Sequence, residues 1–177
     1  MLLARRAVEV EHDQPGLGVL RTQTARADQL LERPLTLRKI GIGKGNDRLV
    51  GGTSRDTLTG GSGPGRDVFE YNAFNETGKT ASTRDYIVDF VHGVDKIDLL
   101  TIDANGTAAG YGTFKFLAAK GAAFTGVKGQ LHWFQVNSAN PAADRTFIEG
   151  DINGDKRADF QIELKGLKVL AAYDFVL

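Results

Sequence analysis

The chain has 177 residues, of which 22 are basic, 22 are acidic and none is cysteine. Its zero net charge gives no electrostatic reason to expect a nucleic acid or an anionic membrane as partner. The absence of cysteine excludes disulfides and thiolate metal sites. No apolar run approaches the roughly 18 residues of a membrane-spanning helix, so membrane insertion is not expected. With 41% apolar residues, the chain can bury a core of its own.

Residues 1–33 differ in composition from the rest of the chain. The first residues, MLLARRAVEVEHD, lack the apolar run of a secretory signal, so export through the general pathway is not expected. The stretch from Ala25 to Arg33 predicts a short helix that Pro34 ends. The other residues are charged and aperiodic. They indicate a loosely ordered segment, which is either a cap on the first following coil or a leader that packs on nothing.

A glycine-rich repeat occupies residues 41–69, GIGKGNDRLVGGTSRDTLTGGSGPGRDVF. Aspartates recur at Asp47, Asp56 and Asp67, and each is followed two positions later by an apolar residue. The insertion of Pro64 and Gly65 lengthens the third copy. The pattern matches the nonapeptide G-G-x-G-x-D-x-U-x, which is the calcium-binding repeat of RTX proteins.

Calcium binding follows from the oxygen atoms that such turns present. Glycine tolerates positive φ, so the turns can aim backbone carbonyls at one point, and each aspartate adds a charged oxygen. Because calcium takes six to eight oxygen ligands, two turns must share one ion. The candidate ligands are Gly43, Gly45, Asp47, Gly52, Asp56, Gly61, Gly63 and Asp67.

The spacing also predicts which turns share an ion. Two nonapeptides per coil would stack the first turn on the third, so we expect Asp47 and Asp67 to face one ion. Asp56 needs a partner turn before Arg38 or after Phe69, where the glycines are missing. The prediction is therefore one well-formed calcium site and at most a partial second one. The alternative for the whole stretch is a plain glycine-rich linker.

A second candidate calcium loop is DINGDKRAD, residues 151–159. Its side-chain oxygens at positions 1, 3, 5 and 9 and its carbonyl at position 7 follow the order of an EF-hand loop. Lys156 and Ile162 replace the glycine and the glutamate that an EF-hand requires. The alternative is a polar hairpin with an asparagine-glycine turn. The candidate ligands are Asp151, Asn153, Asp155, Arg157 and Asp159.

Strand signals fill the rest of the chain. Short alternating segments bounded by glycine, asparagine or aspartate predict strands, and no long helical period separates them. We therefore expect an all-β fold, with a short parallel β-roll of calcium-binding repeats over 34–70 and antiparallel β-strands over 71–177. The strands predicted from the third repeat onward are 68–74, 86–90, 96–100, 113–117, 130–136, 145–149, 160–164 and 175–177.

No motif supports catalysis, so no enzyme activity is expected. The three histidines are far apart and form no H-E-x-x-H zinc motif. Residues 73–80, AFNETGKT, lack the first glycine of a phosphate-binding loop and lead into a strand. Glu149 and Glu163 have the residue types of a glycosidase acid and base, but nothing around them in the sequence indicates a raised pKa.

Four further aspartates lie at the ends of predicted strands, namely Asp85, Asp89, Asp95 and Asp98. At such positions, capping of backbone N–H groups and exposure to solvent are the ordinary arrangement. These residues are therefore interpreted as exposed caps.

Several segments together resemble a known family. They are DVFEYNAFNETGKTASTRDYIVDFVHGVDKIDL, AAFTGVKGQLHWF, FIEGDINGDKRADFQIELKG and the terminal AAYDFVL. In this combination, the chain from Gly41 to Leu177 is similar to the C-terminal module of serralysin-type metalloproteases and related RTX exoproteins. The run IVDF, the run GVDKIDL, and the terminal aspartate with its three apolar residues make the resemblance specific.

The resemblance implies a secreted, extracellular, non-catalytic module that binds Ca²⁺ in a parallel β-roll and depends on it for folding. It also implies an uncleaved C-terminal signal for a type I secretion apparatus, which would be Asp174, Phe175, Val176 and Leu177. The sequence contains no protease motif, so proteolysis does not carry over. Similar modules follow alginate-modifying epimerases. The alternative is therefore an accessory fragment of a secreted metalloprotease or of an alginate-modifying enzyme.

Overall fold

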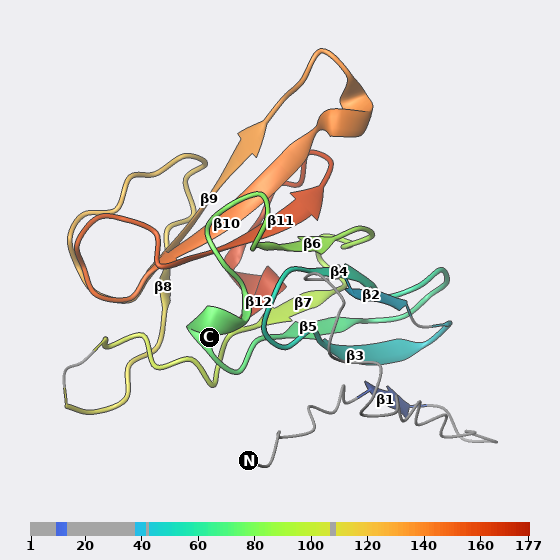
Figure 1. Cartoon of the computed structure of the whole chain (residues 1–177), viewed down its shortest axis with the longest axis horizontal. Helices are drawn as coiled ribbons and strands as arrows, with labels where there is room; N and C mark the ends of the chain where they lie inside the picture. Colours follow the sequence, from blue (N-terminus) through green and yellow to red (C-terminus); the bar gives the residue numbers. More distant parts are fainter. Residues whose placement is uncertain (1–9, 14–37, 42, 107–108) are drawn as a thin grey trace, which may run out of the picture.

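The computed structural model describes residues 10–13, 38–41, 43–106 and 109–177, and it consists of two β-sheets (Figure 1). The expected all-β class is confirmed, because the helices of the described residues are single 3-10 turns. The five-stranded sheet contains, in spatial order, β1 (Val10–Asp13), β3 (Asn46–Val50), β5 (Val68–Glu70), β7 (Lys96–Asp98) and β12 (Phe175–Val176). The seven-stranded sheet contains β2 (Arg38–Gly41), β4 (Asp56–Thr59), β6 (Asp85–Ile87), β11 (Phe160–Lys165), β10 (Arg145–Asp151), β9 (Gln130–Val136) and β8 (Lys115–Phe116). The 3-10 turns are η2 (Phe74–Glu76), η3 (Pro141–Ala143) and η4 (Ala172–Asp174), and the helix predicted at 25–33 lies outside the described residues.

Successive strands from β2 to β7 alternate between the two sheets, which makes this part of the chain a parallel β-roll. Even-numbered strands pair in parallel with one another, and so do odd-numbered strands. In Figure 1, β2, β4 and β6 lie above β3, β5 and β7. Each glycine-rich turn therefore carries the chain from one sheet to the other.

One apolar side chain per strand fills the space between the two sheets of the roll. In the odd sheet, Leu49 is in register with Phe69, which is in register with Ile97. In the even sheet, Leu58 is in register with Ile87. All five side chains are fully buried. Because side chains alternate along a strand, strands this short place one central residue in the core, and the repeat supplies it.

The parallel pairing continues beyond the predicted boundary at residue 70. β6 and β7 extend the roll, β11 pairs in parallel with β6, and β12 pairs in parallel with β7. The expectation of purely antiparallel strands over 71–177 is therefore wrong for these elements. The reason is that the apolar residues of β6 and β7 keep the register of the repeats, although the turns before them are not glycine-rich repeats.

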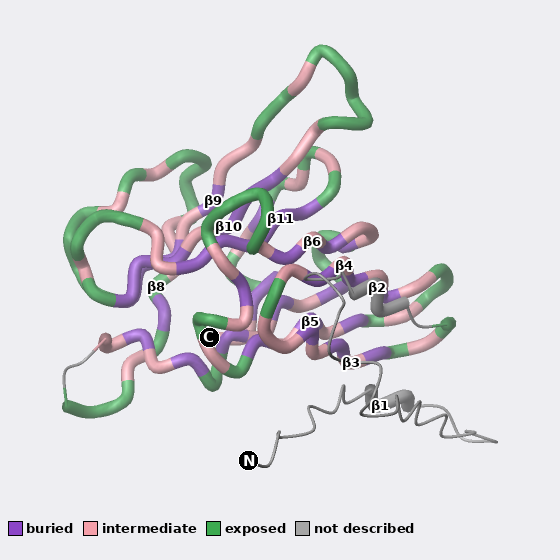
Figure 2. The backbone as a smooth tube through the Cα atoms, viewed as in Figure 1, coloured by how far each residue is buried: buried purple, intermediate pink, exposed green. Residues whose placement is uncertain are grey.

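Antiparallel pairing joins β9, β10 and β11, as the sequence predicted for this region. Ile148 of β10 lies opposite Trp133 of β9 and Ile162 of β11. These three side chains are buried and belong to the same hydrophobic core as the roll. Figure 2 shows this continuity, because buried residues follow the strands while exposed residues gather in the turns and loops.

The N-terminal segment contributes one strand that the sequence analysis did not include. β1 pairs antiparallel with β3, with Val10 opposite Leu49 and Asp13 opposite Asn46. It thereby covers the outer edge of β3 in the five-stranded sheet. An edge strand presents unpaired N–H and C=O groups, and pairing with β1 satisfies them.

Candidate functional site

Three aspartates form a column along the turns that lead into the odd-numbered strands. The N–H of Asp47 donates to Oδ1 of Asp67 at 3.0 Å, and the N–H of Asp67 donates to Oδ1 of Asp95 at 3.0 Å. All three residues are buried. The carboxylates of Asp67 and Asp95 thus each accept a hydrogen bond from the aspartate of the preceding coil. We call Asp47, Asp67 and Asp95 the odd stack, which brings together the two residues expected to share an ion.

A second column lies along the turns that lead into the even-numbered strands. The N–H of Asp56 donates to Oδ1 of Asp85 at 2.7 Å, and both residues are buried. Thr77 Oγ1 in turn accepts from the N–H of Asp85 at 2.9 Å. We call Asp56 and Asp85 the even stack. Asp56 therefore has the partner turn that the sequence analysis did not find.

The interpretation of Asp85 and Asp95 as exposed caps is wrong. Asp85 is fully buried, and Asp95 is 2% exposed. A signal in the sequence could have identified them, because Asp85-Tyr86-Ile87 and Asp95-Lys96-Ile97 repeat the aspartate-x-apolar spacing of the nonapeptides. The segments before Asp85 and Asp95 lack the glycine pairs of the nonapeptides, so this spacing was not recognised as part of the repeat.

Asp89 adds a carboxylate beside the turns that lead into the odd-numbered strands. Its Oδ1 and Oδ2 accept from the N–H groups of Gly60 at 3.0 Å and Gly61 at 2.8 Å. Among the other predicted glycines, Gly45, Gly52 and Gly63 have positive φ, as does Gly61 itself. Gly43 has open space around its Cα and no positive φ.

The glycine turns of neighbouring odd coils are in close contact. A Cβ placed on Gly65 would lie 2.0 Å from the carbonyl oxygen of Gly45, which belongs to the preceding odd turn. Within one turn, a Cβ placed on Gly60 would lie 2.1 Å from Oδ2 of Asp67. Such distances are far inside van der Waals contact, so only glycine fits at these positions. The contact of Gly65 with Gly45 places the backbones of successive odd turns side by side.

Substitution of Gly65 tests this stacking. Gly65→Ala is expected to lower the free energy of unfolding by about 2–4 kcal/mol, because the backbone carbonyl of Gly45 cannot move aside as a side chain would. Urea unfolding in the presence of calcium measures the change. Gly43→Ala is the matched control and should change stability by less than about 1 kcal/mol. Equal effects of the two substitutions would contradict the stacking.

Burial shifts the pKa of three carboxyl groups of the stacks, those of Asp67, Asp85 and Asp95, upward. Desolvation is the largest cause for Asp85, whose pKa is raised to about 8, and the neighbouring charge of Asp56 raises it further. Desolvation also raises the pKa of Asp67 and of Asp95, and the carboxylate of Asp95 adds to the shift at Asp67. A cation between the coils would remove this cost, because it favours the ionised form.

The donor set of the stacks fits calcium. No group of three or more His, Cys, Asp or Glu side chains converges on one point in the part of the chain that the structure describes. The carboxylates therefore do not form a site of side chains alone, and the glycine-turn carbonyls would have to supply the other oxygens. Calcium accepts such mixed carbonyl and carboxylate ligands. Oδ2 of Asp85 is buried without a hydrogen-bond partner, which leaves one carboxyl oxygen available to a cation.

The second candidate loop, residues 151–159, is closed by its own hydrogen bonds. Asp151 accepts from the N–H groups of Gly154 at 2.7 Å and Lys156 at 2.9 Å. Asp159 Oδ2 accepts from the N–H of Ile152 at 2.8 Å. Asn153 and Asp155 accept from the N–H two residues later, the latter from Arg157. This arrangement agrees with the polar-turn alternative, and the loop stays a secondary candidate for an ion.

The terminal residues form the last strand of the odd sheet. Asp174 is fully buried and accepts from the N–H of Ala171 at 2.8 Å and of Gly93 at 2.9 Å. His92 Nδ1 lies 2.9 Å from Oδ2 of Asp174. Phe175 of β12 is in register with Ile97 of β7. Asp174, Phe175, Val176 and Leu177 thus complete the roll beside the turn that carries Asp89 and Asp95.

The two glutamates weighed as a glycosidase pair are held by positive or polar partners. Glu163 accepts from Arg84 Nε at 2.6 Å and from Arg145 Nε at 2.8 Å. Glu149 lies 2.8 Å from His132 Nε2. These contacts account for both carboxylates as parts of the sheet surface.

In the described residues, no helix is both long enough and apolar enough to span a bilayer.

The chain is similar to known proteins. A family model described as Peptidase M10 serralysin C terminal matches residues 33–177. The chain is similar to the solution structure of the AlgE6R2 subunit of the Azotobacter vinelandii mannuronan C5-epimerase. The identity is 25%, the match covers 73% of this chain and 70% of that chain, and the TM-score is 0.46. For the AlgE6R3 subunit, the identity is 19%, the coverage is 78% and 77%, and the TM-score is 0.40. None of the curated proteins compared matches the chain.

Proposed function

Because the chain belongs to the serralysin C-terminal family of Peptidase M10, we propose that it is a secreted, non-catalytic module whose roll folds when it binds calcium. The observation that carries this proposal is the pair of buried aspartate stacks. Along each stack, a carboxylate accepts the N–H of the aspartate on the neighbouring coil. Buried carboxylates at this density need a cation or protons to offset their desolvation.

Calcium would be held between successive turns on each side of the roll. The odd stack and the even stack supply carboxylates, and the glycine-rich turns supply carbonyl oxygens. Calcium would contribute positive charge at these positions, and the residues of the turns would supply and orient the oxygens that hold it. Since glycines lose much backbone entropy on folding, the turns would remain open without the ion.

The calcium affinity expected for an extracellular module would restrict calcium binding, and hence folding of the roll, to the outside of the cell. Such modules bind calcium at about 10⁻⁴ to 10⁻³ M, so the ion would bind outside the cell and not within it. A ligand that binds only the folded state stabilises it by about 2.7 kcal/mol at a hundredfold excess over its dissociation constant. That is a large share of the stability of an ordinary domain.

The terminal motif supports the proposal that export precedes calcium binding and folding of the roll. We propose that Asp174 to Leu177 serve as the signal for a type I secretion apparatus. In the folded chain, Asp174 and Phe175 are buried and β12 is paired. A receptor would therefore read this motif before the roll closes, when calcium is scarce.

Deletion of residues 174–177 should abolish export from a host that carries a matching exporter, while intracellular protein levels persist.

The hydrogen bonds of Asp174 give a second prediction. Asp174→Asn is expected to destabilise the calcium-bound chain by about 1–3 kcal/mol, because an amide has one acceptor oxygen for several donors. Thermal unfolding in calcium measures this change. Asp144→Asn is the control, since Asp144 caps the N–H of Ser138 in a distant loop. An Asp174→Asn variant as stable as the control would contradict the assigned role of Asp174.

A further inference from the structure

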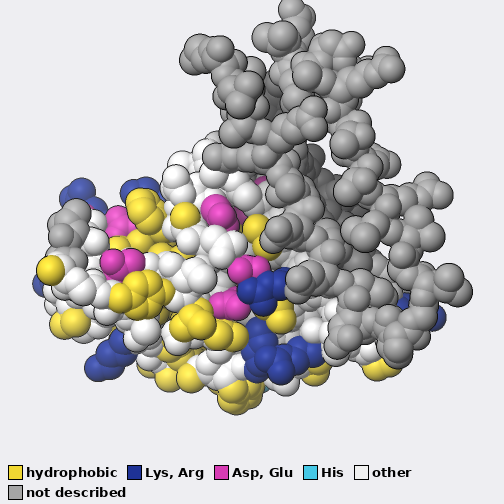
Figure 3. Space-filling model, turned by 90° about the horizontal axis from the view of Figure 1, so that it is seen from below, with side chains coloured by type: hydrophobic (Ala, Val, Ile, Leu, Met, Phe, Trp, Pro, Cys, Tyr) yellow, Lys and Arg dark blue, Asp and Glu magenta, His cyan; other side chains and the backbone are white. Residues whose placement is uncertain are grey.

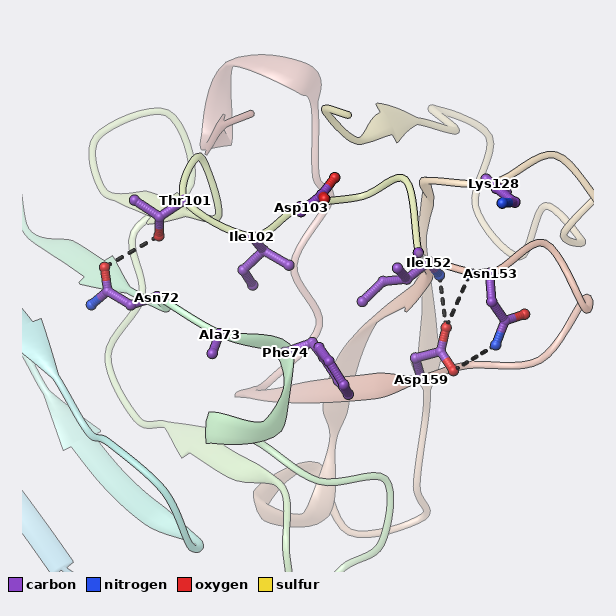
Figure 4. Close-up of a pocket in the computed structure, with 11 residues that line it drawn as sticks. Asn72, Ala73, Phe74, Thr101, Ile102, Asp103, Lys128, Ile152, Asn153 and Asp159 are labelled. Carbon is purple, nitrogen blue, oxygen red and sulfur yellow. Dashed lines mark hydrogen bonds between the residues drawn. The ribbon is translucent and has the colours of Figure 1, made fainter. Parts of the chain in front are cut away.

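A cavity of about 460 Å³ lies where the roll meets the C-terminal sheet (Figure 4). Its lining comes from the loop after β5, the loop after β7 and the loop between β10 and β11, together with Lys128. Cavities of this size between structural units are common binding places for small molecules. The cavity contains no residue of the odd or even stack, although Ile152, Asn153 and Asp159 of the second candidate loop line it.

Apolar side chains form the centre of this cavity. In Figure 4, Phe74, Ile102 and Ile152 lie in the middle of the cavity. Asn72 and Thr101 lie on one side of them, and Asn153 and Asp159 lie on the other. Ile102 and Ile152 are buried, whereas Phe74 is 49% exposed. A phenyl ring presents a flat apolar face, and covering it with C–H groups removes apolar surface from water. A well-matched ligand therefore has a flat apolar face of its own.

Unused donors and unused acceptors surround the apolar centre. Oδ1 of Asn72 accepts from Thr101 at 3.2 Å, which leaves the amide NH₂ group for a ligand. Oδ1 of Asp103 accepts two backbone N–H groups, at 3.0 and 2.9 Å, which leaves Oδ2. Lys128 reaches the carbonyl of Asn105 only at 3.4 Å. Hydroxyl groups both donate and accept, so they satisfy a mixed set of this kind.

The charges of the lining select against anionic ligands. Asp103 and Asp159 carry negative charge, and Lys128 carries positive charge. A phosphate or carboxylate would meet two like charges and only one opposite charge, so the lining as a whole repels it. On the face shown in Figure 3, acidic and basic side chains are likewise interspersed among the coloured residues.

We propose that this cavity binds a neutral sugar. One face of the sugar ring would lie against Phe74, and its hydroxyls would meet Asn72, Asp103 and Lys128. A sugar ring combines the two properties that the lining requires, because it has an apolar C–H face and a rim of hydroxyl groups. The volume accommodates one ring or two.

A nuclear magnetic resonance titration of the full chain with calcium tests this proposal. The probes are the methyl glycosides of glucose, mannose and galactose, with glucuronate as the charged counterpart. At least one neutral glycoside should shift the amide signals of residues 72–74, 101–106 and 152–153, with a dissociation constant of about 1–10 mM. Glucuronate should bind more weakly than glucose glycoside, because of the two carboxylates.

Substitution of the aromatic ring sharpens the test. Phe74→Leu should weaken binding about tenfold, whereas Phe74→Tyr, which keeps the ring face, should preserve it. Tyr111→Leu is the matched control, because Tyr111 is 59% exposed and does not line the cavity. The proposal is overturned if none of the three glycosides shifts these signals at about 50 mM. Stronger binding of glucuronate, or unchanged affinity in Phe74→Leu, would also overturn it.

Discussion

Removing calcium at pH 8 is expected to abolish the protection of the roll against hydrogen exchange. The amides of β3 to β7 should exchange at least about a hundredfold faster, which corresponds to the loss of about 2.7 kcal/mol for one site at a hundredfold excess of calcium. The physical reason is that carboxylates of the odd and even stacks are buried and need a cation once they are ionised. The strands β9 and β10, which are far from the stacks along the seven-stranded sheet, should lose less protection.

Substitutions in the odd stack separate a specific site from a general effect of the ion. Asp67→Asn combined with Asp95→Asn should greatly reduce the calcium dependence of protection, because both carboxylates of the odd stack lose their charge while their volume is kept and only the even stack still binds the ion. Asp98→Asn is the control, since Asp98 lies on β7 and faces Arg48 at 3.6 Å. Protection that is the same with calcium and with chelator in the unsubstituted chain would refute the proposed calcium switch.

The stability of the calcium-free chain is expected to fall as the pH rises from about 4 to about 8. The pKa of Asp85 is raised to about 8 by burial, whereas an unfolded aspartate titrates near 3.9. Between these values the folded state holds a proton that the unfolded state has released, so the free energy of unfolding decreases with pH and levels off above pH 8. About 1.4 kcal/mol per pKa unit sets an upper bound of about 6 kcal/mol for this change. Raised pKa values of Asp67 and Asp95 act in the same direction.

Urea unfolding at pH 5 and pH 8, each with and without calcium, measures this dependence. The calcium-free chain should have a cooperative transition at pH 5 that is weakened or lost at pH 8, and calcium should restore it at pH 8. Asp85→Asn should be more stable than the unsubstituted chain at pH 8 without calcium, because no charge is buried. A calcium-free chain that gains stability from pH 5 to pH 8 would contradict the assignment of Asp85 to a buried stack.

Local patterns in the sequence predict much of the fold. The strand 130–136 was predicted with the bounds that β9 has, and the roll followed from aspartate-x-apolar spacing at Asp47, Asp56 and Asp67. Both signals are local, because the alternation of side chains and the positive φ of glycine turns depend on a few neighbouring residues.

Only the tertiary structure decided which coils meet. Asp85 keeps the aspartate-x-apolar spacing but follows a long loop without the glycine repeat, so its partner coil cannot be read from the repeat. Asp174 lies 79 positions after Asp95, and no local pattern places it beside the roll. Pairing of β4 with β6 brings Asp85 to Asp56, and pairing of β7 with β12 brings Asp174 to the turn of Gly93. The burial of Ile87, Ile97 and Phe175 in one shared core stabilises this long-range pairing. The same burial makes candidate calcium ligands of carboxylates that would otherwise be ordinary strand-end groups.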